Sequence, residues 1–151
     1  MIETKEGLRF IDNIYTLNRI ITALDKEPKG YNTEFELYSN EVHTLRFIAE
    51  KEGITQTELS RKMFRTKAAT SIMLSKLEKK GFIIRKTDEE DARVTRLYLT
   101  EVGKRVERGH VAFDSEKVET WMWDIDYDPK ELESANKVME AFAEYIEKNI
   151  L

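Results

Sequence analysis

The 151-residue sequence contains no cysteine, which excludes disulfides, thiolate metal sites and thiol-based redox sensing. It also contains no apolar run close to the ~20 residues that a membrane-spanning helix requires. Charged residues interrupt the N-terminal segment where a secretory signal would have its hydrophobic core. We therefore expect a cytoplasmic protein that has no membrane partner.

Histidine is also scarce, since the chain has only His43 and His110. The two fall in different predicted helices, and neither has a second histidine at helical spacing, so we expect no metal site. Carboxylates are abundant, but no nucleophile, glycine-rich phosphate loop or base constellation accompanies them. We therefore expect a protein that is not an enzyme and holds no cofactor.

Positive charge is concentrated in one part of the chain. The net charge is −4, yet residues 55–110 hold fourteen Lys and Arg against eight Asp and Glu. The segments on either side are both acidic. Binding to phosphates depends on the charge of the touching face, because salt screens interactions beyond ~8 Å. The basic segment therefore indicates a nucleic-acid interface, and a solvated surface without a partner is the alternative.

The central segment predicts a helix-turn-helix followed by a hairpin. A capping box over 55–58 begins a short helix, and Thr66 caps the next helix, which Gly81 ends. Two β-branched and aromatic segments, 82–87 and 94–99, flank a charged tip and predict a β-hairpin. The core face of the second helix is expected to consist of Ala69, Ile72, Met73 and Leu77, with Leu74 as a further candidate.

Longer helices flank this segment. Apolar residues at three- and four-residue steps predict a helix over 5–26, a second helix begins with Ser39 as its cap, and Asp128-Pro129 begins the last helix. The terminal helices carry more apolar surface than the small core can cover, which typically marks an interface.

The predicted fold class is mainly α with a small β-hairpin wing, a winged helix-turn-helix flanked by N- and C-terminal dimerisation helices. We expect residues 39–100 to form the winged helix-turn-helix and residues 1–30 and 101–151 to form the dimerisation helices of one domain over 1–151.

Five short motifs between Ser39 and Gly103 carry a family resemblance. They are Leu59-Ser60, the stretch from Leu77 to Phe82, Arg85, Asp91-Ala92-Arg93, and the stretch from Leu99 to Gly103. Together with the order of the helices, they make the chain resemble the MarR family of winged helix-turn-helix transcriptional regulators. The resemblance implies a sequence-specific DNA-binding regulator, a repressor that binds a pseudo-palindromic operator in double-stranded DNA as a homodimer.

The resemblance also implies which residues contact DNA. The recognition helix begins after Thr66, so the positions that follow would lie near base edges or phosphates. Arg93 matches the wing arginine that reaches into the minor groove, and Asp91 matches the acid that steadies the arginine region. The predicted DNA-binding residues are Thr66, Lys67, Ala68, Thr70, Ser71, Ser75, Lys76, Arg85, Asp91 and Arg93.

The regulation usual in the family implies a small aromatic or anionic effector, bound between the dimerisation helices and the winged helix, that releases the DNA. The predicted ligand-binding residues are Tyr15, Arg19, Tyr38, His43, Phe47, His110 and Phe113. One alternative is that these side chains form a filled core. Another is that the winged helix is a protein-interaction module whose basic face meets an acidic partner.

Overall fold

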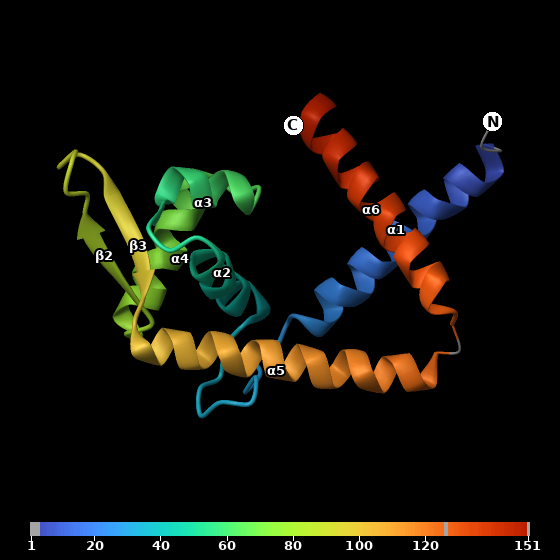
Figure 1. The fold of residues 1–151 in the computed structure, drawn as a ribbon, viewed down its shortest axis with the longest axis horizontal. Helices are drawn as coiled ribbons and strands as arrows, with labels where there is room; N and C mark the ends of the chain where they lie inside the picture. Colours follow the sequence, from blue (N-terminus) through green and yellow to red (C-terminus); the bar gives the residue numbers. More distant parts are fainter. Residues whose placement is uncertain (1–3, 126, 151) are drawn as a thin grey trace. The chain divides into compact units, whose positions relative to one another are not determined.

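The chain forms helices joined by a small antiparallel sheet, which the computed structural model describes for residues 4–125 and 127–150 (Figure 1). The predicted fold class, mainly α with a hairpin wing, is confirmed. No helix in these two ranges is long and apolar enough to cross a bilayer. The elements are α1 (Thr4–Leu24), α2 (Ser39–Glu50), β1 (Ile54–Thr55), α3 (Gln56–Lys62), α4 (Lys67–Lys79), β2 (Ile83–Thr87), β3 (Thr95–Leu99), α5 (Glu101–Asp124) and α6 (Pro129–Asn149).

The chain divides into two compact units, the first ending at Phe113 and the second beginning at Asp114. Helix α5 contributes to both. The core of the first unit joins α2, α3, α4 and the sheet. The fully buried members of this core include Leu37, Val42, Leu45, Ile48, Leu59, Leu74, Leu77 and Val106. Burying one aliphatic side chain of this kind contributes about 1.5–3 kcal/mol.

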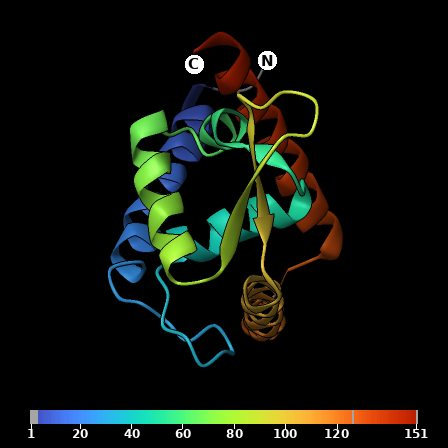
Figure 2. The same ribbon diagram turned by 90° about the vertical axis from the view of Figure 1, so that its left-hand side faces the viewer.

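The sheet has three strands in the order β1-β3-β2, all antiparallel. Ile83 pairs with Leu99 in the predicted hairpin, and Ile54 of β1 pairs with Leu97. Strand β1 has only two residues and was not predicted. β2 runs beside α4, so the wing and the second helix of the helix-turn-helix share one edge of the core (Figure 2).

The predicted ends of the central helices are confirmed. The Glu58 amide donates to Thr55 Oγ1 at 3.3 Å, and Glu58 Oε2 accepts from the Thr55 amide at 2.8 Å. Gly81 has a φ of 77°, which a residue with a side chain rarely adopts, and it ends α4. The predicted Ser39 cap is wrong by one position, because α2 begins at Ser39 and Tyr38 precedes it as the N-cap.

A close joint connects the sheet to α5. Thr100 Oγ1 accepts from the Gly103 amide at 3.0 Å and donates to the Gly81 carbonyl at 2.7 Å. The Thr100 amide donates to the Phe82 carbonyl at 3.0 Å. A Cβ at Gly103 would collide with the same carbonyl. The first turn of α5 therefore packs directly on backbone, and only glycine leaves the space for it.

Helices α1 and α6 bury none of their side chains within the chain. Leu17, Ile21 and Leu24 of α1 are 54–61% exposed, and Val138 and Met139 of α6 are 53% and 44% exposed. Each of these helices therefore presents an apolar face to solvent.

Candidate nucleic-acid interface

The capped start of α4 sets which of its faces points inward. Thr66 Oγ1 accepts from the Ala69 amide at 3.1 Å. Thr70 is 1% exposed, and its hydroxyl donates to the Thr66 carbonyl at 3.0 Å. Thr70 therefore lies in the core with Leu74 and Leu77, and its prediction as a DNA-contacting residue is wrong.

The opposite face of α4 is open to solvent. At about 3.6 residues per turn, the residues opposite Thr70, Leu74 and Leu77 form a single ridge. Ile72 is 74% exposed, so its predicted place in the core is wrong, as is that of exposed Ala69. The ridge consists of Ala68, Ile72, Ser75 and Lys79, all exposed. Ala68 and Ser75 are among the predicted DNA-contacting residues, whereas Ile72 and Lys79 are not.

A buried carboxylate anchors the end of α4 to α2. Glu41 is 0% exposed, and its Oε1 accepts from Lys80 Nζ at 2.7 Å and pairs with Lys76 Nζ at 3.2 Å. Its Oε2 accepts from the Tyr38 amide at 2.9 Å. Burial raises the pKa of Glu41, but the hydrogen bonds from Lys80, Tyr38 and Lys76 and the charge of Lys80 outweigh it, so the net pKa is lowered.

This arrangement changes the role expected of Lys76. Its ammonium group pairs with Glu41 and lies 5.1 Å from the centre of the Tyr38 ring. A cation held in this way is less available to a phosphate than a free one. By contrast, Lys67 and Lys79 are exposed and form no ion pair within the described parts of the chain.

The first wing strand is tied to α4 through Arg85. Its Nε donates to Glu78 Oε2 at 3.1 Å, and its Nη2 donates to Ser75 Oγ at 3.4 Å. Arg85, which was predicted to contact DNA, therefore fixes the wing beside the ridge through these two hydrogen bonds. Ser71 is half-buried on the flank of α4.

The wing tip presents an arginine that its neighbour orients. Arg93 Nε and Nη2 donate to the two oxygens of Asp91 at 3.0 and 3.1 Å, and the Arg93 amide donates to Asp91 Oδ1 at 3.0 Å. The guanidinium holds the pKa of Asp91 below its usual value. The Arg93 side chain is 90% exposed. The pair therefore projects a cation from the tip in a defined direction.

A second arginine anchors the base of the wing and was missed in the sequence. Arg96 contacts the Asp88 carboxylate, and its Nη1 donates to the Gly53 carbonyl at 3.1 Å. Asp88 also accepts from the Glu90 and Asp91 amides at 2.9 and 3.0 Å. The bond from Arg96, followed by these amides, lowers the pKa of Asp88. The signal was an Asp and an Arg eight residues apart across a hairpin.

The predicted ligand-binding residues do not converge on one pocket. His43 and His110 meet edge to face with ring centres 5.0 Å apart. Tyr31, which was not predicted, joins His110 and Phe113 at 5.2 and 5.1 Å. His110 is 1% exposed, so this part is a packed aromatic cluster. The structure therefore favours the filled-core alternative for His110 and Phe113.

A surface cavity of about 370 Å³ is lined in part by His43. Phe47 also lines it, together with Lys62 and with Phe64 and Arg65 of the turn that precedes α4. Tyr15 and Arg19 do not line it, and both are exposed on α1. Tyr38 lies against Lys76 instead. Two of the seven predicted residues, His43 and Phe47, therefore share a cavity.

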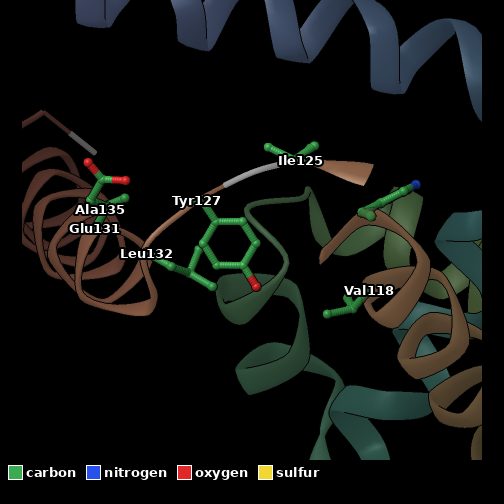
Figure 3. A pocket seen from close by; sticks show the side chains of 7 residues that line it. Val118, Ile125, Tyr127, Glu131, Leu132 and Ala135 are labelled. Atoms are coloured by element: carbon green, nitrogen blue, oxygen red, sulfur yellow. The ribbon is translucent and has the colours of Figure 1, made fainter. Parts of the chain in front are cut away.

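The second unit contains an apolar cavity of about 450 Å³ between the end of α5 and the start of α6 (Figure 3). Val118, Ile125, Tyr127 and Leu132 line it, and Figure 3 shows these side chains around the space. Among the described residues, no group of three His, Asp or Glu side chains is placed to hold a metal ion.

Comparisons with known proteins agree with this architecture. Residues 37–95 match the model of the MarR family. Transcriptional regulator AdcR of Streptococcus pyogenes is 27% identical over 142 residues, which cover 91% of this chain and 95% of that protein. Over residues 37–95 the chain is therefore similar to the MarR family, and AdcR, which it matches over most of its length, is a transcriptional regulator.

Solved structures share the fold. FabT of Streptococcus pneumoniae in complex with DNA has a TM-score of 0.73 at 22% identity, over 97% of this chain and 99% of that one. Staphylococcus aureus MarR in complex with salicylate and kanamycin has a TM-score of 0.82 at 19% identity, over 96% of this chain and 95% of that one.

Proposed function

We propose that this chain is a MarR-family regulator that binds a pseudo-palindromic DNA operator as a homodimer and represses transcription. The observation that carries the proposal is the open ridge of α4, which lies in the basic part of the chain together with an exposed wing arginine, Arg93. An α-helix fits the major groove, and an arginine on an exposed tip can reach the minor groove. FabT, which has the same fold, forms a complex with DNA.

The parts of this surface would have separate roles. Ridge residues of α4 would contact base edges, and Lys67 at the N-terminus of α4 would contact a phosphate. Lys79 would contact a phosphate of the DNA backbone further along the groove. Arg93, oriented by Asp91, would enter the minor groove beside the site. Base contacts would specify the operator, and phosphate contacts would position the protein.

Selection from a random duplex library, followed by titration of the preferred duplex, tests the proposal. Arg93→Ala should weaken binding at least about fivefold without altering the circular dichroism spectrum. Arg9→Ala is a matched control, since Arg9 is also exposed and pairs with a near neighbour, Glu6, at 3.3 Å. Equal affinities of wild type and Arg93→Ala would disprove the wing role.

Salt dependence separates the proposal from the protein-interaction module. Binding of a duplex should weaken steeply with ionic strength, with a log–log slope of about −0.9 for each phosphate contacted. Preference for the selected duplex over a scrambled one should persist at each salt concentration. Binding without such preference would favour the module instead.

The homodimer proposal rests on the exposed apolar faces of α1 and α6. We expect sedimentation at micromolar concentration to give a dimer, because apolar surface of this extent is seldom left in water. Ile21→Glu and Val138→Glu should each shift the protein towards monomer. Lys137→Glu, a charge change on an exposed α6 side chain, should leave the dimer intact. A wild-type monomer under these conditions would contradict the proposal.

A second proposal concerns regulation, because the cavity beside His43 and Phe47 touches the turn that leads into α4. Its aromatic residues and the cations Lys62 and Arg65, which outnumber the one acid Asp25, suit a small aromatic anion, and salicylate is bound to S. aureus MarR. A ligand shifts the protein between two states only by its difference in affinity for them. Salicylate should therefore raise the melting temperature and weaken DNA binding, and His43→Ala should reduce both effects. Binding that leaves DNA affinity unchanged would exclude this regulation.

A further inference from the structure

The centre of the ridge on α4 is an isoleucine rather than a polar residue. Ile72 is 74% exposed and lies directly opposite the buried Leu74 and Leu77 side of the helix. β-branched residues form helices less readily than alanine or leucine. Neither packing within the first unit nor helix propensity accounts for isoleucine here. A single exposed apolar side chain is ordinary on a protein surface, so its place on this particular ridge is what matters.

The neighbours of Ile72 restrict what the first half of the ridge can contact. Ala68 precedes it by one turn, and exposed Ala69 lies beside it. None of these three side chains can donate or accept a hydrogen bond. Hydrogen bonding on the ridge begins only at Ser75 and Lys79. The first half of the ridge therefore offers methyl groups where a recognition helix commonly offers amides or guanidinium groups.

The major groove offers one apolar group to such a surface. Among the base edges, only the 5-methyl group of thymine is apolar, and aliphatic side chains contact it. The flanking charges favour nucleic acid over an apolar protein partner, since Arg65, Lys67 and Lys79 are exposed around the ridge. The surroundings of Ile72 are thus basic, as a groove lined by phosphates requires.

The length of the apolar segment limits how many bases it can read. Ala68 and Ile72 are four residues apart, which corresponds to ~6 Å along a helix that rises 1.5 Å per residue. Successive bases in one strand are ~3.4 Å apart. The segment therefore spans roughly two base pairs, so at most two neighbouring thymines in each half-site should matter.

We propose that Ile72 is a specificity-determining residue that reads the 5-methyl group of thymine in the major groove. Ala68, which carries only a methyl group, gives the helix room to bring Ile72 to that depth. This inference rests on the proposed function, because it requires α4 to enter the major groove of a duplex. It adds to the proposed function that Ile72 recognises thymine.

Replacing thymine by uracil tests the inference, since this removes the methyl group and keeps every hydrogen bond of the base. The duplex preferred by the wild type is prepared with deoxyuridine at each thymidine position in turn. At one or two positions the substitution should weaken wild-type binding about fourfold, the ratio for ~0.8 kcal/mol per buried methyl-sized group. For Ile72→Ala, the same substitutions should change the affinity less than twofold.

Ile84→Ala is the matched control, because Ile84 is a 39% exposed isoleucine on β2 rather than on α4. It should respond to uracil as the wild type does, and circular dichroism should confirm that both variants are folded. Equal sensitivity to uracil in Ile72→Ala and wild type, or no sensitive position at all, overturns the inference while duplex binding survives. Failure of the wild type to prefer any duplex would overturn the proposed function as well.

Discussion

Replacing Glu41 with glutamine tests whether a buried carboxylate holds α4 against α2. The substitution keeps the size of the side chain and removes its charge. The wild-type carboxylate is 0% exposed, but Lys76 and Lys80 are 48% and 32% exposed. Hydrogen bonds to charged groups contribute about 1.5–3 kcal/mol each when shielded, so two half-exposed ones should contribute about 2–3 kcal/mol together. We expect Glu41→Gln to lower the free energy of unfolding by that amount at neutral pH.

Glu50→Gln is the matched control. Glu50 also pairs with two cations, Lys62 at 2.6 Å and Arg46 at 3.3 Å, but its side chain is 43% exposed. An exposed pair of this kind typically contributes about 0–1 kcal/mol. Urea denaturation at one protein concentration measures both variants, since self-association would otherwise shift the midpoint. Equal effects of the two substitutions would refute a special role for burial.

The lysines and the pH supply two further checks on Glu41. Lys80→Met should cost less in the Glu41→Gln background than in the wild type, because the two residues share one interaction. The folded pKa of Glu41 is below its ordinary 4.5, so its contribution is complete above that pH and is lost as pH falls through the folded pKa. The stability difference between wild type and Glu41→Gln should therefore shrink in acid. Strict additivity, or a difference that grows in acid, would disprove the network.

Three other predictions concern the rest of the first unit. Gly103→Ala should destabilise the protein by about 1–3 kcal/mol or prevent folding in the same denaturation assay, because the new Cβ would collide with the Phe82 carbonyl. Gly7→Ala is the control, since Gly7 has open space around it, and it should be neutral or stabilising. Lys51 and then the Thr55 amide lower the pKa of Glu58 from 4.5 to about 2, so Lys51→Met should move the NMR titration of Glu58 up towards 4.5. The contribution of Glu58 to stability should be complete above pH 4.5 and disappear as pH falls towards 2. Arg96→Ala should speed hydrogen exchange in the wing tip, because Asp88, which accepts from the Glu90 and Asp91 amides there, loses its contact with Arg96, while exchange in α2 stays unchanged.

Signals that depend on a few neighbouring residues were predictable from the sequence. The capping box at Thr55, the helix start at Asp128 and the stop at Gly81 each involve residues within about one turn. Their chemistry allows few alternatives, so the predicted ends agree with the structure. The two-residue strand β1 was missed because its pairing partner Leu97 is distant in sequence and two residues carry no periodicity.

The main error was the predicted orientation of α4, that is, which of its side chains face the core. Ranking by hydrophobicity places Ile72 inward and Thr70 outward, whereas the structure has the reverse. A threonine can be buried at little cost when its hydroxyl bonds to the carbonyl four residues earlier, as Thr70 does with Thr66. The Glu41 network was missed for another reason, since Glu41 and Lys80 are 39 residues apart and only the tertiary fold brings them together.

The contact between Gly103 and Phe82 has a consequence for attempts to graft the α4 and wing segment of another protein onto this chain. Because the first turn of α5 packs on the backbone of Gly81 and Phe82, between α4 and β2, a foreign segment that replaces these two residues would lack the matching surface for α5. Exchange of α4 alone leaves this contact intact, but an exchange of the hairpin that includes Gly81 and Phe82 does not. The smallest transplantable cassette therefore runs from Thr66 through Gly103, with its own threonine and glycine at the junction.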